Sequence, residues 1–241
     1  MLKALVPSPI AKQIIDTYLS VCRYTEEPVL TEERRKPFIV IEGNHRSSKT
    51  VIGQKLAQLL GGRLISQVAP CLRKYSTQLM GSHPLRRPLQ FLSLYATAFD
   101  AKVQISLDRP VVVNSYWTEQ LAFTVTRVFH AGALPPISAE FFHYPEDLLR
   151  PDLHIFLDFG EAVLTTTPAY TVHYAIVNYR KTSNLRKRKL ELYRHMQSEV
   201  PIHIHELERV THLKTAKQLV EVVRANLSQT RDLTSTSLLD Y

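Results

Sequence analysis

Five short apolar runs, each followed by a helical pattern, constrain the fold of this chain most strongly. The runs predict buried strands at Phe38–Glu42, Arg63–Ser66, Val111–Asn114, His154–Asp158 and Ile202–His205. Helical patterns alternate with them at Lys49–Leu60, Leu89–Phe99, Thr118–Phe129, Asn184–Ser198 and Leu207–Leu227. Parallel strands need crossover connections, which are usually helices. The alternation therefore predicts an α/β three-layer sandwich, with a five-stranded parallel sheet and helices on both faces.

Length and composition are typical of one large globular domain. The chain has 241 residues, of which 44% are hydrophobic and 22% charged, so a disordered, fibrous or repeat protein is not expected. We expect a partly helical N-terminal extension over residues 1–35, the main domain over residues 36–229, and a polar, flexible C-terminal tail over residues 230–241.

The cysteines and the apolar runs bear on the compartment. Cys22 and Cys71 lie far apart and lack a CxxC spacing, so we predict neither a disulfide framework nor a zinc site, and a reducing compartment. No apolar run approaches the roughly 20 residues of a membrane helix, and the N-terminus lacks the apolar core of a secretory signal. Its first residues carry two lysines and no acid, so we expect a cytoplasmic or mitochondrial protein without a transmembrane segment.

The formal net charge of +8 favours acidic partners, such as nucleotides, nucleic acid or anionic lipid. A basic run, RKRK at residues 186–189, is followed by Leu190, Leu192 and Tyr193 at helical spacing. We interpret it first as a solvated helix face. A phosphate clamp and a patch for nucleic acid or membrane are the alternatives. Nucleic acid is the least favoured partner, because no aromatic residues are interleaved with the charges.

The segment IEGNHRSSKT, from Ile41 to Thr50, is the strongest local motif, since it joins a predicted strand to a predicted helix. In the Walker A pattern G-x-x-x-x-G-K-[ST], backbone amides wrap phosphates, the lysine reaches them, and the hydroxyl ligates magnesium. Gly43, Lys49 and Thr50 fit this pattern, and Ser48 stands at the second glycine. A positive φ at Ser48 would weaken phosphate binding. An ordinary strand-to-helix turn is the competing interpretation.

Several segments together resemble the thymidylate kinase family of P-loop kinases, most closely its mitochondrial UMP-CMP kinase branch. They are PFIVIEG with the following loop, the pair Arg86-Arg87 before a helix, VVVNSYW from Val111 to Trp117, and YPEDLLRPDLHIFLDFGEAV from Tyr144 to Val163. The likeness runs from Lys36 to the last predicted helix. It implies the P-loop NTPase fold and transfer of a phosphoryl group from ATP, with Mg²⁺, to a pyrimidine nucleoside monophosphate.

The resemblance also implies roles for individual residues. Nucleotide-binding positions are Gly43, Arg46, Ser47, Ser48, Lys49 and Thr50, with Lys49 and Arg46 catalytic and Thr50 at the metal. Arg86 or Arg87 would clamp the acceptor phosphate. Tyr116 and Trp117 would line the acceptor pocket, and their competing interpretation is as core aromatics. A homodimer is implied by resemblance only.

Three departures from the family pattern predict that phosphoryl transfer is weak or lost. His45 replaces an acidic residue, Asn114-Ser115 replaces an Asp-Arg pair, and the lid segment Leu164–Asn178 contains no lysine or arginine. The first hypothesis is therefore a nucleotide-binding pseudoenzyme. One alternative is an active dTMP or UMP/CMP kinase rebuilt around Arg46 and the cluster from Arg180 to Lys189. The other is a non-enzymatic interaction scaffold.

Overall fold

A five-stranded parallel sheet organises the chain. The computed structural model describes residues 8–31, 35–43, 46–79, 81, 83–129, 132–159, 172–207 and 211–228. The strands are β1 (Phe38–Gly43), β2 (Arg63–Ile65), β3 (Val111–Asn114), β4 (Leu153–Phe159) and β5 (Ile202–Leu207). Their order across the sheet is β2-β3-β1-β4-β5, and all neighbours are parallel. The predicted α/β fold is thus confirmed.

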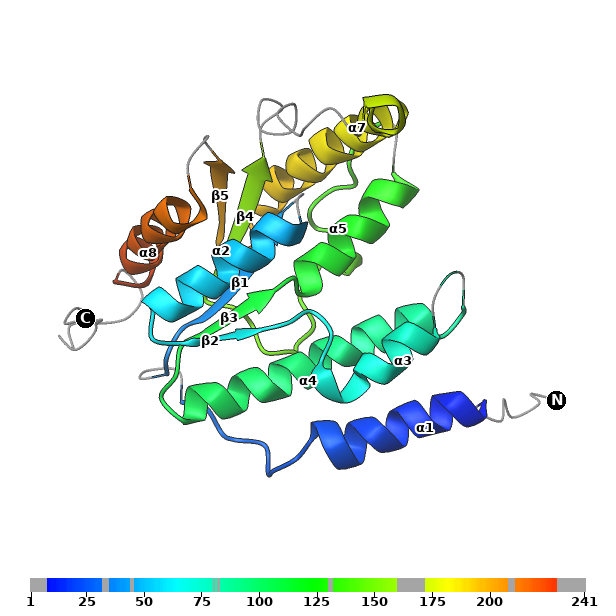
Figure 1. Cartoon of the computed structure of the whole chain (residues 1–241), viewed down its shortest axis with the longest axis vertical. Coiled ribbons are helices and arrows are strands. Elements are labelled where there is room, and N and C mark those ends of the chain that lie inside the picture. Colours follow the sequence, from blue (N-terminus) through cyan, green and yellow to red (C-terminus); the bar gives the residue numbers. More distant parts are fainter. Residues whose placement is uncertain are drawn as a thin grey trace.

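Helices cover both faces of the sheet (Figure 1). The α-helices are α1 (Pro9–Thr17), α2 (Arg46–Leu59), α3 (Arg73–Gln78), α4 (Arg86–Ser106), α5 (Trp117–Val128), α7 (Val172–Met196) and α8 (His212–Ser228). Shorter helical turns are η1 (Tyr18–Cys22), η2 (Pro70–Leu72) and η3 (Glu140–Phe142). One core cluster joins α2 and α8 to the sheet, and two others join α4, α5 and α7 to the opposite face.

The predicted elements exist, and the differences from their predicted bounds are at their ends. The largest is at α7, which starts at Val172 and not at Asn184. Helix α4 starts at Arg86 and not at Leu89, so the Arg86-Arg87 pair opens the helix instead of preceding it. Helix α8 starts at His212 and not at Leu207, because Leu207 is the last residue of β5. The short helix α3 was not predicted. Residues 230–241, the expected tail, lie outside the described residues.

The N-terminal extension is bound to the domain by a disulfide. Cys22 in η1 is bonded to Cys71 in η2, with 5.5 Å between their Cα atoms. Ile14 of α1 packs in the same apolar cluster as Leu72 and Leu79, and Figure 1 shows α1 outside α3 and α4. The prediction of unpaired cysteines is therefore wrong. Because Cys22 and Cys71 are 49 residues apart in the sequence, no local pattern indicated that the extension folds back onto α3 and α4.

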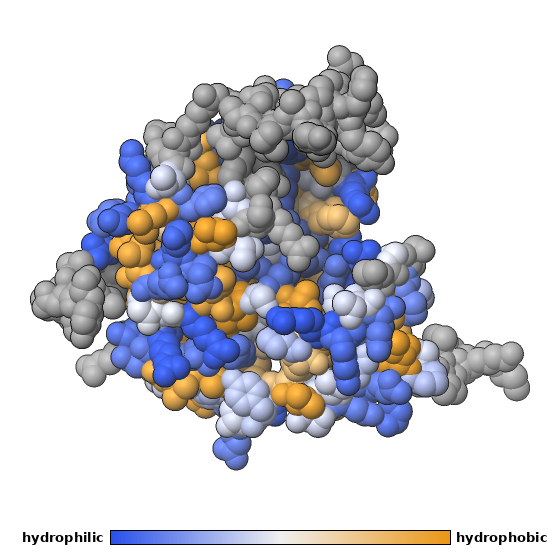
Figure 2. All heavy atoms as spheres, viewed as in Figure 1, coloured by the Kyte–Doolittle hydropathy of each residue, from blue (hydrophilic) through white to orange (hydrophobic). Residues whose placement is uncertain are grey.

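On the face shown in Figure 2, hydrophobic side chains are scattered among hydrophilic ones. Across the described ranges, we find no helix that combines the length and the apolar character needed to cross a membrane. The compartment stays a prediction, and the argument from unpaired cysteines no longer supports it.

Candidate functional site

Gly43 ends β1 at the carboxyl edge of the sheet, where ligands of parallel α/β sheets bind. Its φ is +152°, and a Cβ at this position would lie 2.6 Å from the carbonyl oxygen of Leu157 in the neighbouring strand. No side chain fits there. The glycine therefore allows β1 to approach β4 closely just where the predicted phosphate loop begins.

Lys49 and Thr50 reach a cavity of about 410 Å³ at this edge. We call it the phosphate-loop cavity; it is lined by Lys49, Thr50, Leu64, Ser66, Gln67, Val68, Arg73, Ser76, Thr77, Asn114 and Ser115. Lys49 is 6% exposed, and its ammonium group donates a short hydrogen bond to Ser115 Oγ. Lys49 thus faces a cavity, as a phosphate-binding lysine must.

Ser48 is not strained at the position of the Walker glycine. It lies inside α2, whereas the described non-glycine residues with positive φ are Asp108 and Ser115. Its hydroxyl lies 3.3 Å from Nε2 of His212, the first residue of α8. The condition under which the serine would weaken phosphate binding, a positive φ, is therefore not met.

Asn114 connects the end of β3 to the first turns of α2. Its amide Nδ2 donates to Thr50 Oγ1 over 2.9 Å, and its buried Oδ1 has no hydrogen-bond partner. These neutral groups, with Lys49, suit a phosphate. They bring no carboxylate, whereas Mg²⁺ at phosphate sites is usually held by one or two carboxylates together with the phosphates.

Arg86 and Arg87 point in different directions. Arg86 lines a second cavity of about 490 Å³, the Arg86 cavity, and donates to the carbonyl oxygen of Gly81 over 2.9 Å. Arg87 turns to α5, where its guanidinium stacks 4.0 Å from the Phe123 ring centroid. Burial, and then repulsion by Arg127 and Arg86, lower the pKa of Arg87. Arg86 thus lines the Arg86 cavity, and Arg87 packs against α5.

The two cavities adjoin each other, and neither predicted aromatic lines them. They share the lining residues Gln67, Val68, Ser76 and Thr77. Tyr116 is fully buried and packs edge-on against Phe38. Trp117 opens α5 and packs against Phe91 and Tyr144. The acceptor-pocket role of both aromatics stays a prediction, and their packing matches the competing interpretation as core residues.

Glu42, which the sequence analysis passed over, is a fully buried carboxylate beside Gly43. It accepts hydrogen bonds from the backbone amides of Tyr116 and Glu119, each over 3.0 Å. The hydroxyl of Thr118 donates to it over 2.7 Å, and the hydroxyl of Tyr193 donates a shorter bond. The sequence indicated this site through an acidic residue in the apolar run FIVIEG, because a carboxylate buried in a strand needs hydrogen-bond donors around it.

Two further charged residues lie at the carboxyl edge. Arg73, the first residue of α3, lines the phosphate-loop cavity and adds a second cation to it. Asp158, at the end of β4, pairs with Arg186, whose Nε lies 3.5 Å from its Oδ1. Burial raises the pKa of Asp158, and Arg186 opposes this shift. Arg73 was missed because α3 was not predicted.

The basic run of α7 is largely paired within the molecule. Besides Arg186, Arg188 pairs with Glu191 over 2.8 Å and Lys189 pairs with Glu119 over 2.6 Å. Lys187 is exposed. The Arg186 and Lys189 pairs join α7 to β4 and α5, and the Arg188 pair lies within the helix, so the run matches the first interpretation better than a free basic patch.

Some predicted site residues fall outside the described part of the chain. These are His45 and residues 164–171 of the lid segment. Arg46, Ser47 and residues 172–183 are described as helix, without their side chains. The roles of Arg46, Ser47, Arg180 and Lys181 therefore stay predictions.

Comparisons with known proteins concern the fold. No protein-family model matches the sequence, and no curated protein matches it either. The solved structure of thymidylate kinase from Candida albicans, an enzyme described as having broad substrate specificity, matches with a TM-score of 0.57. The sequences are 16% identical, and the match covers 80% of this chain and 93% of that chain. The sheet and helices described above are thus arranged as in that thymidylate kinase.

Proposed function

We propose that this chain binds nucleotides at the carboxyl edge of its sheet and that its phosphoryl transfer is weak or lost. The observation that carries the proposal is the placement of Lys49, Thr50 and Arg73 around one cavity that adjoins the Arg86 cavity. Phosphate groups prefer such an arrangement of cations and a hydroxyl at the start of a helix.

The donor phosphates belong beside Lys49 and Thr50 in this proposal, and the acceptor phosphate near Arg73 and Arg86. ATP, with Mg²⁺ held by Thr50, is the proposed donor, and the resemblance to the UMP-CMP kinase branch makes a pyrimidine nucleoside monophosphate the proposed acceptor. Tyr116 is left out of the acceptor contacts because its side chain is fully buried.

Weak transfer follows from the charges around the cavity. Asn114 and Ser115 supply no carboxylate and no guanidinium next to Thr50 and Lys49. Loss of one charge-stabilising arginine lowers phosphoryl transfer about 10³–10⁵-fold in related chemistry. Arg186 is paired with Asp158, so it is not free to replace such a group.

Thermal unfolding and calorimetry with ATP, ADP and dTMP test nucleotide binding. A ligand that binds the folded state raises the melting temperature, so we expect ATP and ADP to stabilise the protein. Lys49→Ala removes this stabilisation, whereas Lys55→Ala, in the same helix but outside the cavity lining, keeps it. A protein that no nucleotide stabilises would contradict the proposal and favour the interaction scaffold.

A turnover assay separates weak transfer from a working kinase. With ATP, Mg²⁺ and dTMP, dUMP, UMP or CMP, we expect rates well below the roughly 1–100 s⁻¹ of kinases. A rate in that range that Arg46→Ala abolishes would instead support the rebuilt active site.

A further inference from the structure

A separate cavity of about 490 Å³ opens at the amino edge of the sheet, opposite the phosphate loop. Arg150 and Pro151 precede β4 and Pro201 precedes β5, and all three line it. His154 of β4 also lines it, three residues before Leu157, which pairs with Gly43. Three strand residues span about 10 Å, so this cavity lies apart from the phosphate-loop cavity.

His154 brings a buried hydrogen-bond acceptor to this cavity. Its Nδ1 lies 3.1 Å from Thr118 Oγ1, and the single hydroxyl proton of Thr118 is donated to Glu42. Thr118 must therefore accept from Nδ1, so Nδ1 carries the proton and Nε2 keeps its lone pair. Burial lowers the pKa of His154 to about 3, which keeps the ring neutral at physiological pH.

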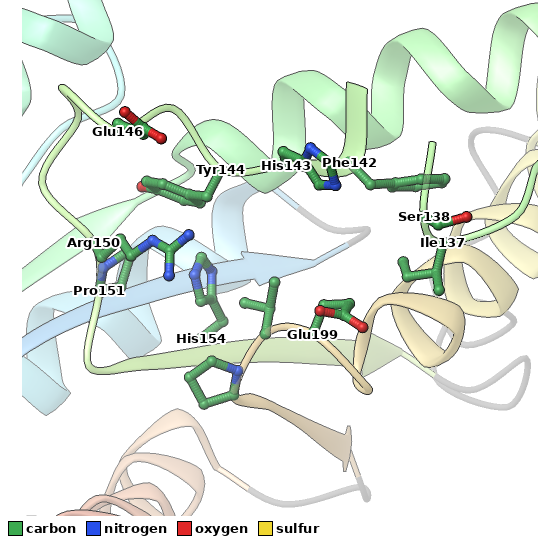
Figure 3. Close-up of a pocket in the computed structure, with 12 residues that line it drawn as sticks. Ile137, Ser138, Phe142, His143, Tyr144, Glu146, Arg150, Pro151, His154 and Glu199 are labelled. Atoms are coloured by element: carbon green, nitrogen blue, oxygen red, sulfur yellow. The ribbon is translucent and has the colours of Figure 1, made fainter. Parts of the chain in front are cut away.

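The acceptor on His154 lies at the cavity wall. The residue is 1% exposed and lines the cavity, and its Nδ1 is the ring nitrogen that contacts Thr118. Figure 3 shows the ring at the cavity beside the Arg150 side chain. An N–H or O–H donor that enters the cavity therefore gains a hydrogen bond to the lone pair of Nε2.

Arg150 supplies a cation at the same cavity. It is exposed, lies 5.4 Å from the ring centroid of Tyr144, and makes no ion pair with another described residue. Phe142, Tyr144 and the prolines add apolar wall, and Glu146 and Glu199 also line the cavity, so Arg150 is the group there that attracts an anion. The volume is within the usual range of about 300–1,000 Å³ for small-molecule sites.

We propose that the amino-edge cavity binds a small aromatic carboxylic acid that carries a ring N–H or O–H group. The carboxylate pairs with Arg150, the ring lies against Phe142 and Tyr144, and the N–H or O–H donates to His154 Nε2. No bond is made or broken, and Lys49 has no part in this binding.

Calorimetry on the full chain with three probes tests each contact. Indole-3-acetate has both groups, 1-methylindole-3-acetate lacks the N–H, and indole lacks the carboxylate. We expect indole-3-acetate to bind at one site, and each missing group to weaken binding about tenfold. In the Arg150→Ala variant, indole-3-acetate and indole should bind with the same affinity, because the partner of the probe's carboxylate is absent.

Arg109→Ala is the matched control, since Arg109-Pro110 precedes β3 as Arg150-Pro151 precedes β4. The Arg109→Ala variant should bind indole-3-acetate as tightly as the unaltered chain does. The same affinity is expected for the Lys49→Ala variant and for the unaltered chain saturated with ADP. The proposal is overturned if indole-3-acetate does not bind, if the methylated probe binds equally well, if Arg150→Ala leaves the affinity unchanged, or if ADP displaces the probe. The two proposals fail separately. Lys49→Ala is expected to remove nucleotide binding and to leave probe binding unchanged, whereas Arg150→Ala is expected to weaken probe binding.

Discussion

At the scale of single residues, Asn114 sets how much charge the candidate site offers to a metal. Its amide donates to Thr50, and the other amide atom is buried without a partner. A carboxylate at this position would accept from the Thr50 hydroxyl and bring a negative charge to it. Asn114→Asp should therefore raise the affinity for ATP in the presence of Mg²⁺ about tenfold relative to ATP alone.

Calorimetric titration of ATP with and without Mg²⁺ measures this effect. Asn226→Asp, an exposed substitution on α8, changes the net charge equally and should leave the Mg²⁺ effect as it is. An equal Mg²⁺ effect in the Asn114 variant and the unaltered chain would show that residue 114 does not contribute to the metal site.

The buried His154 predicts how stability depends on pH. Its folded-state pKa of about 3 lies below the ordinary value of 6.5, so the unfolded chain binds a proton that the folded chain does not. The contribution is constant above pH 7 and is lost as the pH falls from 6.5 toward 3. At pH 5 the loss is about 2 kcal/mol.

Urea unfolding at pH 7.5 and pH 5 measures this loss. His154→Gln keeps a polar partner for Thr118 without titrating, so its pH dependence should be smaller by about 2 kcal/mol. His143→Asn, an exposed change at the same cavity, should behave like the unaltered chain. Both variants retain Arg150, Glu146 and Glu199 at the cavity and Glu42 beyond Thr118, so these charges cancel in the comparison.

At the scale of elements, Glu42 of β1 caps helix α5. The residue before the helix, Tyr116, makes no side-chain cap, and Glu42 instead accepts from the amides of Tyr116 and Glu119. Glu42→Gln would replace one acceptor oxygen by an NH₂ group, which would face the N–H and O–H donors that now bond to the carboxylate. We expect a loss of at least about 2 kcal/mol in the free energy of unfolding, because several buried hydrogen bonds are weakened.

Chemical denaturation checks this value. Glu206→Gln, an exposed change on β5, should alter stability by less than about 0.5 kcal/mol. Similar stabilities of the two variants would mean that Glu42 does not hold β1, α5 and α7 together.

The elements were predictable where the periodicity was strong. The strands, and the helices that pack on them, follow from apolar spacing, and Gly43, Lys49 and Thr50 follow from a local motif. The carboxylate network of Glu42 joins residues more than 70 positions apart, which no local pattern reveals. Arg73 was missed for a similar reason, since the six-residue helix α3 is too short to show a period.

At the scale of the whole molecule, the two edges of the sheet carry different chemistry. The carboxyl edge gathers Lys49, Arg73 and Arg86 around adjoining cavities, and the amino edge presents neutral His154 with Arg150. Glu42 lies between them, since it adjoins Gly43 and reaches His154 through Thr118. Ligands at either edge would therefore stabilise one shared framework.

The disulfide extends this framework to the N-terminal extension. The disulfide joins Cys22 and Cys71, which are 49 residues apart. Removing it increases the conformational entropy of the unfolded chain. The double change Cys22→Ser and Cys71→Ser should lower stability by about 2–4 kcal/mol, which corresponds to roughly 4–16 °C in melting temperature. Thermal unfolding with and without a phosphine reductant measures this. The reductant should lower the melting temperature of the unaltered chain to that of the variant and leave the variant unchanged. The prediction is contradicted if both cysteines of the unaltered chain can be alkylated and its melting temperature is the same with and without reductant. The apolar contacts of Ile14 would then hold the extension in place without a disulfide.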